Sequence, residues 1–330
     1  MRMRGLLAPL LILLTALACV SVNAQSVPWP GFGPVRNLLR FDGFTDTVPD
    51  FVGPIDGSAE LTIFTEGNHY AVLLPLVLQR FPEWCRANHA CDADAARILV
   101  VTLPQPMVVR MLTEGGISLG NAVLPVGRDK PVFPDLVMGG VAPLRQLRAA
   151  GVVEGQARIF AHTLGMGMLL SKSLTGVGDL EQFSQHINRL IVASPSEPGA
   201  RQQYRETLAA LLGQPATAQL FAHEVVLFSG RLGIQHRDVP YALINGLADG
   251  GLIFSHLANF YASAFPERLR ALAVPGAERF GQDIAIVRTT RASHALAASF
   301  ERFFMEVAPT AYPEGGFAVL GSAFGTPVDL

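Results

Sequence analysis

Four turns in the sequence carry polar side chains where a strand or loop is expected to lead into a helix. They span residues 66–69, 102–105, 199–201 and 235–237. The first N–H groups of a helix have no partner within the helix, and the helix dipole gives that end a partial positive charge. In an open α/β sheet such turns gather at the carboxyl ends of the strands. The sequence therefore predicts a ligand pocket built from helix N-termini, which suit a small oxyanion.

Histidines suggest a second kind of chemistry at the same turns. His69, His162, His236 and His256 stand at predicted strand ends or helix starts, and Glu66 lies beside the first of them. Imidazole and carboxylate groups suit a transition metal or a metal complex, so these five residues form one candidate metal set. Each histidine also fits the plainer role of a surface residue or a hydrogen-bonded packing residue.

Two arginines occupy the third and fourth turns. Arg201 and Arg237 could each hold an anionic group of a ligand through two parallel hydrogen bonds. The alternative is a solvated charge at the rim of the pocket.

The familiar catalytic motifs do not fit the sequence. Gly116-Ile117-Ser118-Leu119-Gly120 matches the nucleophile elbow by letter, but it follows a helix pattern rather than a strand, so we expect a flexible loop there. The sequence contains no P-loop, HExxH or CxxC motif. We find no nucleophile with an accompanying base, and we expect a protein that binds its ligand without transforming it.

The elements that must position these residues alternate along the chain from about residue 60. Short apolar segments precede segments with helical spacing, which predicts an α/β fold whose helices cover mostly parallel sheets. Pro75 lies inside the first apolar helix and predicts a kink, and Asp179 is placed to cap a short helix. Strands are predicted at 61–64, 97–102, 135–138, 189–193, 251–255 and 283–287, with a longer β-rich run at 157–171. Helices are predicted at 71–81, 106–115, 141–150, 201–212, 236–247, 256–265 and 293–307.

Composition supports a densely cored, folded chain. Hydrophobic residues make up 50% of the 330 residues and charged residues 16%, which excludes a disordered protein. The formal net charge of −2 gives no reason to expect a nucleic acid as partner. Residues 25–57 are rich in proline without a regular period, and we interpret them as an extended arm or linker before the folded body.

The first 24 residues indicate export. Arg2 and Arg4 precede an apolar run over residues 6–20, which is short for a membrane span, and Val22-Asn23-Ala24 offers small residues for a signal peptidase. We therefore predict a cleaved signal peptide over residues 1–24 and a periplasmic protein. An uncleaved anchor and a lipid on Cys19 remain alternatives.

Two cysteines remain after cleavage. Cys85 and Cys91 lie six positions apart in a compartment that permits oxidation, which favours a local disulfide. The alternative is a metal site that includes His89 between them, but that spacing matches no standard zinc site.

The order of these segments and of the turns between them resembles that of the type II periplasmic solute-binding proteins, and in particular of their molybdate-binding branch. The resemblance covers residues 58–325. It is carried by residues 61–68, a first strand and binding turn, by the crossover-like strand 157–172, by the loop and helix at 191–208, by the helix, acidic-glycine turn and strand at 238–255, and by the aromatic ending at 312–317.

The resemblance implies a two-lobed α/β fold in which each lobe is a mostly parallel sheet flanked by helices. Residues 58–160 with 284–330 would form lobe one and residues 161–283 lobe two, joined by crossover strands near 157–163 and 281–287. It also implies a monomer without a cofactor that captures a small oxyanion such as molybdate or tungstate by hinge closure and delivers it to an ABC permease in the inner membrane. A sensory module that presents its ligand to a membrane kinase would share this pattern.

The predicted pocket departs from the molybdate pattern in several positions. Asn68 stands where a serine is expected, Pro104-Gln105 replaces a serine-rich turn, and Phe254 replaces a tyrosine, while Ala200 is retained. Glu66 adds a carboxylate beside the first turn, and His236 enters the fourth. The complete set of predicted ligand-binding residues is Glu66, Gly67, Asn68, His69, Gln105, His162, Ala200, Arg201, His236, Arg237 and Phe254.

Overall fold

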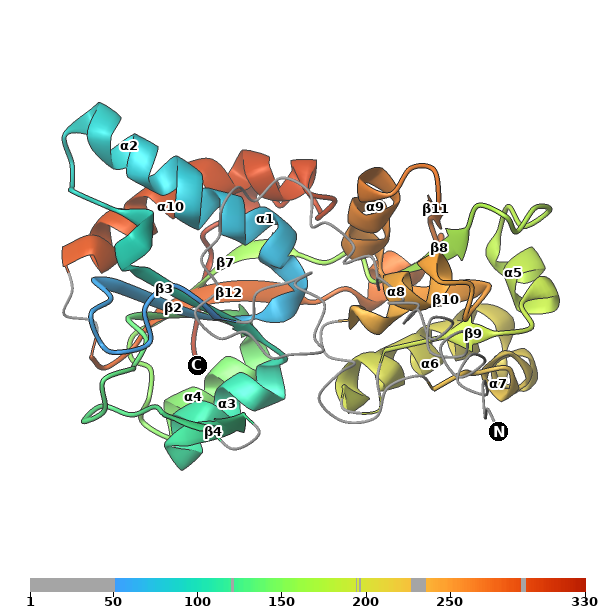
Figure 1. The fold of residues 1–330 in the computed structure, drawn as a ribbon, viewed down its shortest axis with the longest axis horizontal. Helices are drawn as coiled ribbons and strands as arrows, with labels where there is room; N and C mark the ends of the chain where they lie inside the picture. The colour runs from blue at the N-terminus through green and yellow to red at the C-terminus, as the bar shows by residue number, and fades with distance from the viewer. Residues whose placement is uncertain (1–50, 120–121, 194, 196, 227–235, 292–294) are drawn as a thin grey trace, which may run out of the picture.

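The computed structural model describes residues 51–330 apart from 120–121, 194, 196, 227–235 and 292–294 (Figure 1). The predicted signal peptide and Cys19 lie outside the described residues, as do residues 25–50 of the predicted arm. Within the described part, no helix is both long enough and apolar enough to cross a membrane. Two lobes lie side by side along the long axis of the molecule, each with its own sheet and helices (Figure 1).

The first lobe is built on a seven-stranded mixed sheet. The strands β2 and β3 are buried along their whole length and β3 is almost entirely apolar, as expected for parallel strands covered on both faces. Strand β2 is parallel to β3 and β6, whereas β12 is antiparallel to both of its neighbours. In spatial order the strands are β1 (Phe51–Val52), β3 (Ile98–Leu103), β2 (Leu61–Glu66), β6 (Leu136–Gly140), β12 (Asp283–Arg288), β7 (Ala157–His162) and β13 (Pro327–Val328).

Helices cover both faces of this sheet (Figure 1). One face carries α3 (Gln105–Glu114) and α4 (Val141–Ala149). The other carries α1 (Tyr70–Pro75), α2 (Phe81–Asn88) and α10 (Ala295–Glu314). A hairpin of β4 (Gly116–Leu119) and β5 (Ala122–Pro125) follows α3.

The second lobe is built on a four-stranded mixed sheet. Strand β10 is antiparallel to β8 and parallel to β9. The strands in spatial order are β11 (Leu269–Leu272), β8 (Met166–Ser171), β10 (Gly250–Phe254) and β9 (Leu190–Ile191). The helices of this lobe are α5 (Leu180–His186), α6 (Pro198–Leu212), α7 (Gln214–Ala222), α8 (Asp238–Ile244) and α9 (Ser255–Ala264).

Two connections carry the chain between the sheets. Residues 163–165 join β7 to β8, and residues 273–282 return from β11 to β12 through η5 (Ala277–Phe280). The predicted β-rich run 157–171 is therefore broken at the crossover. Gly165 has φ +73°, and a Cβ there would lie 2.1 Å from the carbonyl oxygen of Ala277, so only glycine lets the two connections approach so closely.

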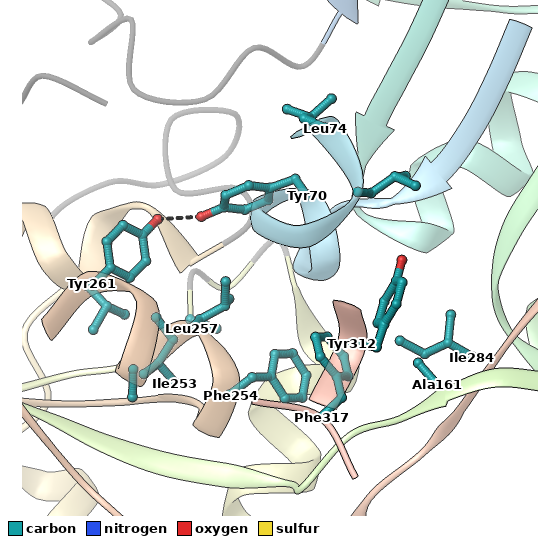
Figure 2. Close-up of a cluster of buried hydrophobic side chains, with 14 of the residues drawn as sticks. Tyr70, Leu74, Ala161, Ile253, Phe254, Leu257, Tyr261, Ile284, Tyr312 and Phe317 are labelled. Atoms are coloured by element: carbon teal, nitrogen blue, oxygen red, sulfur yellow. Dashed lines mark hydrogen bonds between the residues drawn. The ribbon is translucent and has the colours of Figure 1, made fainter. Parts of the chain in front are cut away.

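A buried aromatic row continues the core from one lobe into the other (Figure 2). The ring of Tyr312 packs on Phe317, Phe317 stacks on His256 at a centroid distance of 4.2 Å, and His256 stacks on Phe254. Beside this row, the hydroxyl groups of Tyr70 on α1 and Tyr261 on α9 are 2.7 Å apart. The lobes are thus held together by packed side chains as well as by the two connections.

The predicted two-lobed α/β fold is confirmed, and most predicted elements are present with shifted ends. The helix predicted at 71–81 extends to Asn88, and its hydrogen-bond pattern changes to a π-helix over Leu76–Arg80 directly after Pro75, which has no N–H to donate. The prediction of a flexible loop at 116–120 was wrong for residues 116–119, which form β4. The elements α7, β5, β11 and β13 were not predicted from the sequence, and β1 lies within the segment interpreted as an arm.

The predicted disulfide between Cys85 and Cys91 is confirmed. Cys85 is fully buried near the end of α2, and His89 closes that helix with a left-handed backbone at φ 50°. The bridge therefore fastens the last turn of α2 to the segment that leads to β3.

Reduction of this disulfide should lower the free energy of unfolding by about 2 kcal/mol, because the reduced unfolded chain regains the freedom of a short loop. Urea unfolding with and without reductant measures the difference. The double variant Cys85→Ser, Cys91→Ser is the control and should not respond to reductant. Equal midpoints for the wild-type protein in both conditions would contradict the expectation.

Candidate functional site

A pocket of about 230 Å³ lies at the junction of the two lobes. Its walls come from the carboxyl ends of β2, β3 and β6, from the start of α6 and from the end of β10. Thr163 and Gln282, which flank the crossovers, also line it. The lining residues are Glu66, Asn68, Pro104, Gln105, Pro106, Gly140, Pro143, Thr163, Glu197, Pro198, Gly199, Ala200, Gln203, Phe254, Gln282 and Ile284.

Amide side chains in the lining are held in place by the backbone. The Oε1 of Gln105 accepts a hydrogen bond from the N–H of Gly140 at 2.9 Å, and a Cβ at Gly139 would collide with the Gln105 amide. The Nε2 of Gln203 donates to the carbonyl of Phe280 and that of Gln282 to Gln203 Oε1. These contacts leave the polar wall largely formed before any ligand enters.

Five of the predicted ligand-binding residues line this pocket. They are Glu66, Asn68, Gln105, Ala200 and Phe254. The other six lie outside its lining: Gly67, His69, His162, Arg201, His236 and Arg237.

The histidines of the candidate metal set are occupied by other contacts. His69 is fully buried, with Nε2 2.5 Å from Thr65 Oγ1 and Nδ1 2.6 Å from Tyr312 Oη. The Nδ1 of His162 is 2.8 Å from Asp283 Oδ1, a contact that joins the two crossover strands. Both residues therefore have structural roles.

The other two histidines of the set are also tied to neighbouring groups. The Nε2 of His256 lies 2.7 Å from the carbonyl oxygen of Asn68, which links α9 to the first lobe. The Nε2 of His236 lies 2.7 Å from Tyr204 Oη. In the part of the chain that the structure describes, no group of three or more histidine, cysteine or acidic side chains could hold a metal ion. The structure thus does not bring the candidate metal set together.

Arg201 does not face a ligand. Its guanidinium donates two hydrogen bonds to the carboxylate of Glu224, at 2.5 and 2.9 Å, and one to the carbonyl of Ala193. Arg237 stands at the start of α8, away from the pocket lining. Arg201 is thus committed to a partly buried ion pair, and neither arginine is among the residues that line the pocket.

Glu197 is a functional candidate that was not predicted from the sequence. It precedes α6, is only 7% exposed and lines the pocket. Its Oε2 lies 3.1 Å from His236 Nδ1, although this nitrogen forms no hydrogen bond with a described residue. Its position directly before Pro198 at the start of a helix is the signal that could have identified it.

The electrostatics of the pocket are dominated by carboxyl groups. Burial raises the pKa of Glu66 to about 7, and the neighbouring Glu197 raises it further, whereas the hydrogen bonds from Asn68 and the charge of His236 act in the opposite direction. Among the described residues of the lining there is no lysine or arginine.

Other buried groups around the pocket have shifted pKa values. Burial lowers the pKa of His69 to about 3 and that of His256 to about 4, so both rings are neutral at pH 7. Burial also raises the pKa of Asp238, beneath His236, to about 7. The pocket wall is therefore acidic or neutral rather than positive.

Comparison with known proteins shows the fold. No family model matches the chain. The substrate-binding domain of a putative molybdenum ABC transporter from Clostridium difficile superposes with a TM-score of 0.51 at 10% identity, covering 78% of this chain and 97% of that one. The sulfate-binding protein SubI from Mycobacterium tuberculosis gives 0.52 at 13% identity, over 81% and 92%. Iron-bound HitA from Pseudomonas aeruginosa gives 0.50 at 15% identity, over 77% and 84%.

These structural neighbours are type II periplasmic solute-binding proteins with different ligands, and at such identities they show the shared fold alone. A sequence match of another kind is to the protein nucleotidyltransferase YdiU. The protein from Burkholderia pseudomallei is 26% identical over 201 residues, 57% of this chain and 37% of the relative. That from Burkholderia thailandensis is 27% identical over 191 residues, 54% and 35%. The chain spans about a third of the length of these relatives.

The raised pKa of Glu66 predicts a pH-dependent effect of Glu66→Gln on stability. Between pH 4.5 and about 7 the folded protein keeps a proton that the unfolded chain has lost, so the free energy of unfolding falls as pH rises through this window. Glutamine has no such charge. The variant should therefore gain stability over the wild-type protein across this window, by up to about 3 kcal/mol, and the gain should be constant above it.

Urea unfolding at several pH values from 4.5 to 8.5 measures this difference. Asp238 contributes a fall of the same sign in both proteins and cancels in the comparison. A difference between variant and wild-type protein that does not change with pH would contradict the assignment of a raised pKa to Glu66.

Proposed function

We propose that the protein is the substrate-binding component of an ABC-type importer and captures a small solute between its lobes in the periplasm. The observation that carries the proposal is the position of the pocket. Both lobes contribute walls to it, and both crossover connections pass beside it at Thr163 and Gln282. A pocket at a hinge closes around its ligand, and closure gives a permease a shape to recognise.

Contacts between the lobes support a hinge that closes over the pocket. Tyr70 and Tyr261 join α1 to α9, and His256 reaches the carbonyl of Asn68, whose side chain lines the pocket. A small number of contacts between the lobes is enough for such a hinge. The ligand itself favours the closed form, because it binds the closed form more tightly than the open form. A water molecule takes up roughly 30 Å³ in the liquid. The pocket volume of about 230 Å³ is several times larger, so it has space for a small organic or inorganic solute.

The chemistry of the lining favours capture without reaction. Thr163 is the hydroxyl-bearing residue of the described lining, and its Oγ1 accepts a hydrogen bond from the N–H of Gln282 at 2.9 Å. None of the described lining residues is a histidine, so no imidazole stands beside that hydroxyl as a base. We accordingly propose binding and release as the whole of the activity.

The two ligand classes raised by the sequence receive little support from the site. An oxyanion such as molybdate or tungstate would face both Glu66 and Glu197. Two like unit charges about 4 Å apart repel by about 4 kcal/mol at an effective dielectric constant of 20. A transition metal would need the histidines, but none of the described lining residues is a histidine, and the described residues contain no group of three or more potential metal ligands. The proposal is therefore for solute capture as such, with the ligand to be found by experiment.

Filling the pocket should abolish binding and leave the fold intact. Ala200 lines the pocket at the start of α6, whereas Ala210 is exposed on the same helix. In a thermal-shift panel of small cations, oxyanions, neutral solutes and divalent metals, the solute that stabilises the wild-type protein should stabilise Ala210→Leu equally. The same solute should leave the melting temperature of Ala200→Leu unchanged.

Small-angle X-ray scattering completes this test. Addition of the stabilising solute should reduce the radius of gyration of the wild-type protein and of Ala210→Leu, but not of Ala200→Leu. Equal responses of the two variants to every solute would contradict capture in this pocket.

A further inference from the structure

Two buried carboxyl groups face the pocket from opposite lobes. Glu66 ends β2 in the first lobe and is 8% exposed, and Glu197 precedes α6 in the second lobe and is 7% exposed. Both line the same pocket. A buried carboxylate is expensive unless a positive group or hydrogen-bond donors accompany it. What accompanies each of them therefore indicates what the pocket accepts.

No cationic side chain stands beside this acidic pair in the described lining of the pocket. Arg201, the arginine nearest in sequence to Glu197, is bound by Glu224. His236 lies against Glu197 at 3.1 Å and could balance one negative charge. Glu66 receives its side-chain hydrogen bond from a neutral group, the Nδ2 of Asn68 at 2.9 Å.

The amide of Asn68 supplies an independent sign of a missing donor. Because its Nδ2 is turned to Glu66, its Oδ1 is left as an acceptor, and this oxygen is buried with no hydrogen-bond partner among the described residues. Asn68 lines the pocket beside Glu66. The carboxyl group of Glu66 and the Oδ1 of Asn68 are thus two acceptors on neighbouring residues of one wall. A ligand group with several N–H donors could bind both.

We propose that this pocket binds a small organic amine whose ammonium group donates hydrogen bonds to Glu66 and Asn68 and is attracted by Glu197. The inference rests on the proposed solute-binding function and names its ligand class. A primary ammonium carries three N–H donors and one positive charge, which match the acceptors of this wall. Phe254 and the prolines of the lining contact the carbon skeleton of the ligand.

The position of the two carboxyl groups also couples binding to closure. Glu66 and Glu197 belong to different lobes, so closing the cleft without a cation brings two carboxyl groups into one buried space. An ammonium group between Glu66 and Glu197 is attracted by both carboxyl groups and offsets the repulsion between them. The amine therefore favours the closed form by the same interaction that holds it.

Isothermal titration calorimetry on the mature protein at pH 7.5 and low salt tests the ligand class. The probes are ethylamine, butane-1,4-diamine and agmatine as primary amines or N–H cations, choline as a cation without N–H donors, and molybdate as an oxyanion. We expect binding of at least one N–H cation, with choline at least tenfold weaker than the best of them, and no binding of molybdate.

Three isosteric variants locate the interaction. Glu66→Gln and Glu197→Gln each keep the shape of the side chain, and each should weaken the best amine at least tenfold. Glu206→Gln, on the exposed side of α6, is the matched control and should bind as the wild-type protein does. Unfolding curves of the same preparations show that the variants are folded, and Glu66→Gln is expected to be at least as stable as the wild-type protein.

The outcomes separate this inference from the proposed function. Equal amine affinity in both pocket variants, binding of choline as tight as that of the amines, or the absence of any amine binding overturns the ammonium assignment. Binding of molybdate that strengthens in Glu66→Gln overturns it as well, while leaving solute capture in this pocket intact. Solute capture itself fails only when no solute distinguishes Ala200→Leu from Ala210→Leu.

Discussion

The two crossover connections run side by side and bind each other where they leave the first sheet. Thr163 donates its N–H to the carbonyl of Gln282 at 3.0 Å, and Gln282 returns its N–H to Thr163 Oγ1. At the next turn Gly165 touches the backbone of Ala277. Because the second lobe is attached through these few residues, their mutual contact sets where β10 and α6 stand relative to β2. The pocket exists only because that placement brings Glu197 opposite Glu66.

The buried histidines near this hinge serve as packing and hydrogen-bonding residues. His69 packs among Thr65, Phe160 and Tyr312 in the first lobe, and His256 bridges the lobes through Phe317 and the backbone of Asn68. Burial keeps both rings neutral, so they serve as hydrogen-bonding aromatic side chains. Their predicted positions at strand ends and helix starts suggested metal ligands. In the folded protein both nitrogens of His69 and the Nε2 of His256 contact different neighbouring groups.

The acidic wall separates this pocket from a site made for oxyanions. Helix N-termini do surround it, as expected from the strand-to-helix turns, and Gln105 and Ala200 stand at two of them. The partial positive charges of these helix ends face the two buried carboxyl groups of Glu66 and Glu197 in the same pocket. The fold is shared with structural neighbours named for sulfate and iron binding, and the acidic side chains of the lining are described for this chain.

The sequence by itself determined most of the elements of this protein. The apolar runs that became β2 and β3, the glycine at the end of α3, the Asp179 cap of α5 and the Cys85–Cys91 bridge are all local features, governed by residues within a few positions of one another. The order of these elements resembles that of the type II periplasmic solute-binding proteins, and this resemblance predicted the two-lobed fold. Local patterns also placed Glu66, Asn68, Gln105, Ala200 and Phe254 at turns that do reach the pocket.

Only the tertiary structure decided which polar residues share a wall. The partners of Arg201 and His162 are 23 and 121 positions away, and nothing in the local pattern ranks such pairings. Glu197 looked like an ordinary loop residue until the hinge brought it against the first lobe. Charge pairing depends on distance and burial after folding, and those quantities are set by long-range packing rather than by neighbours along the chain.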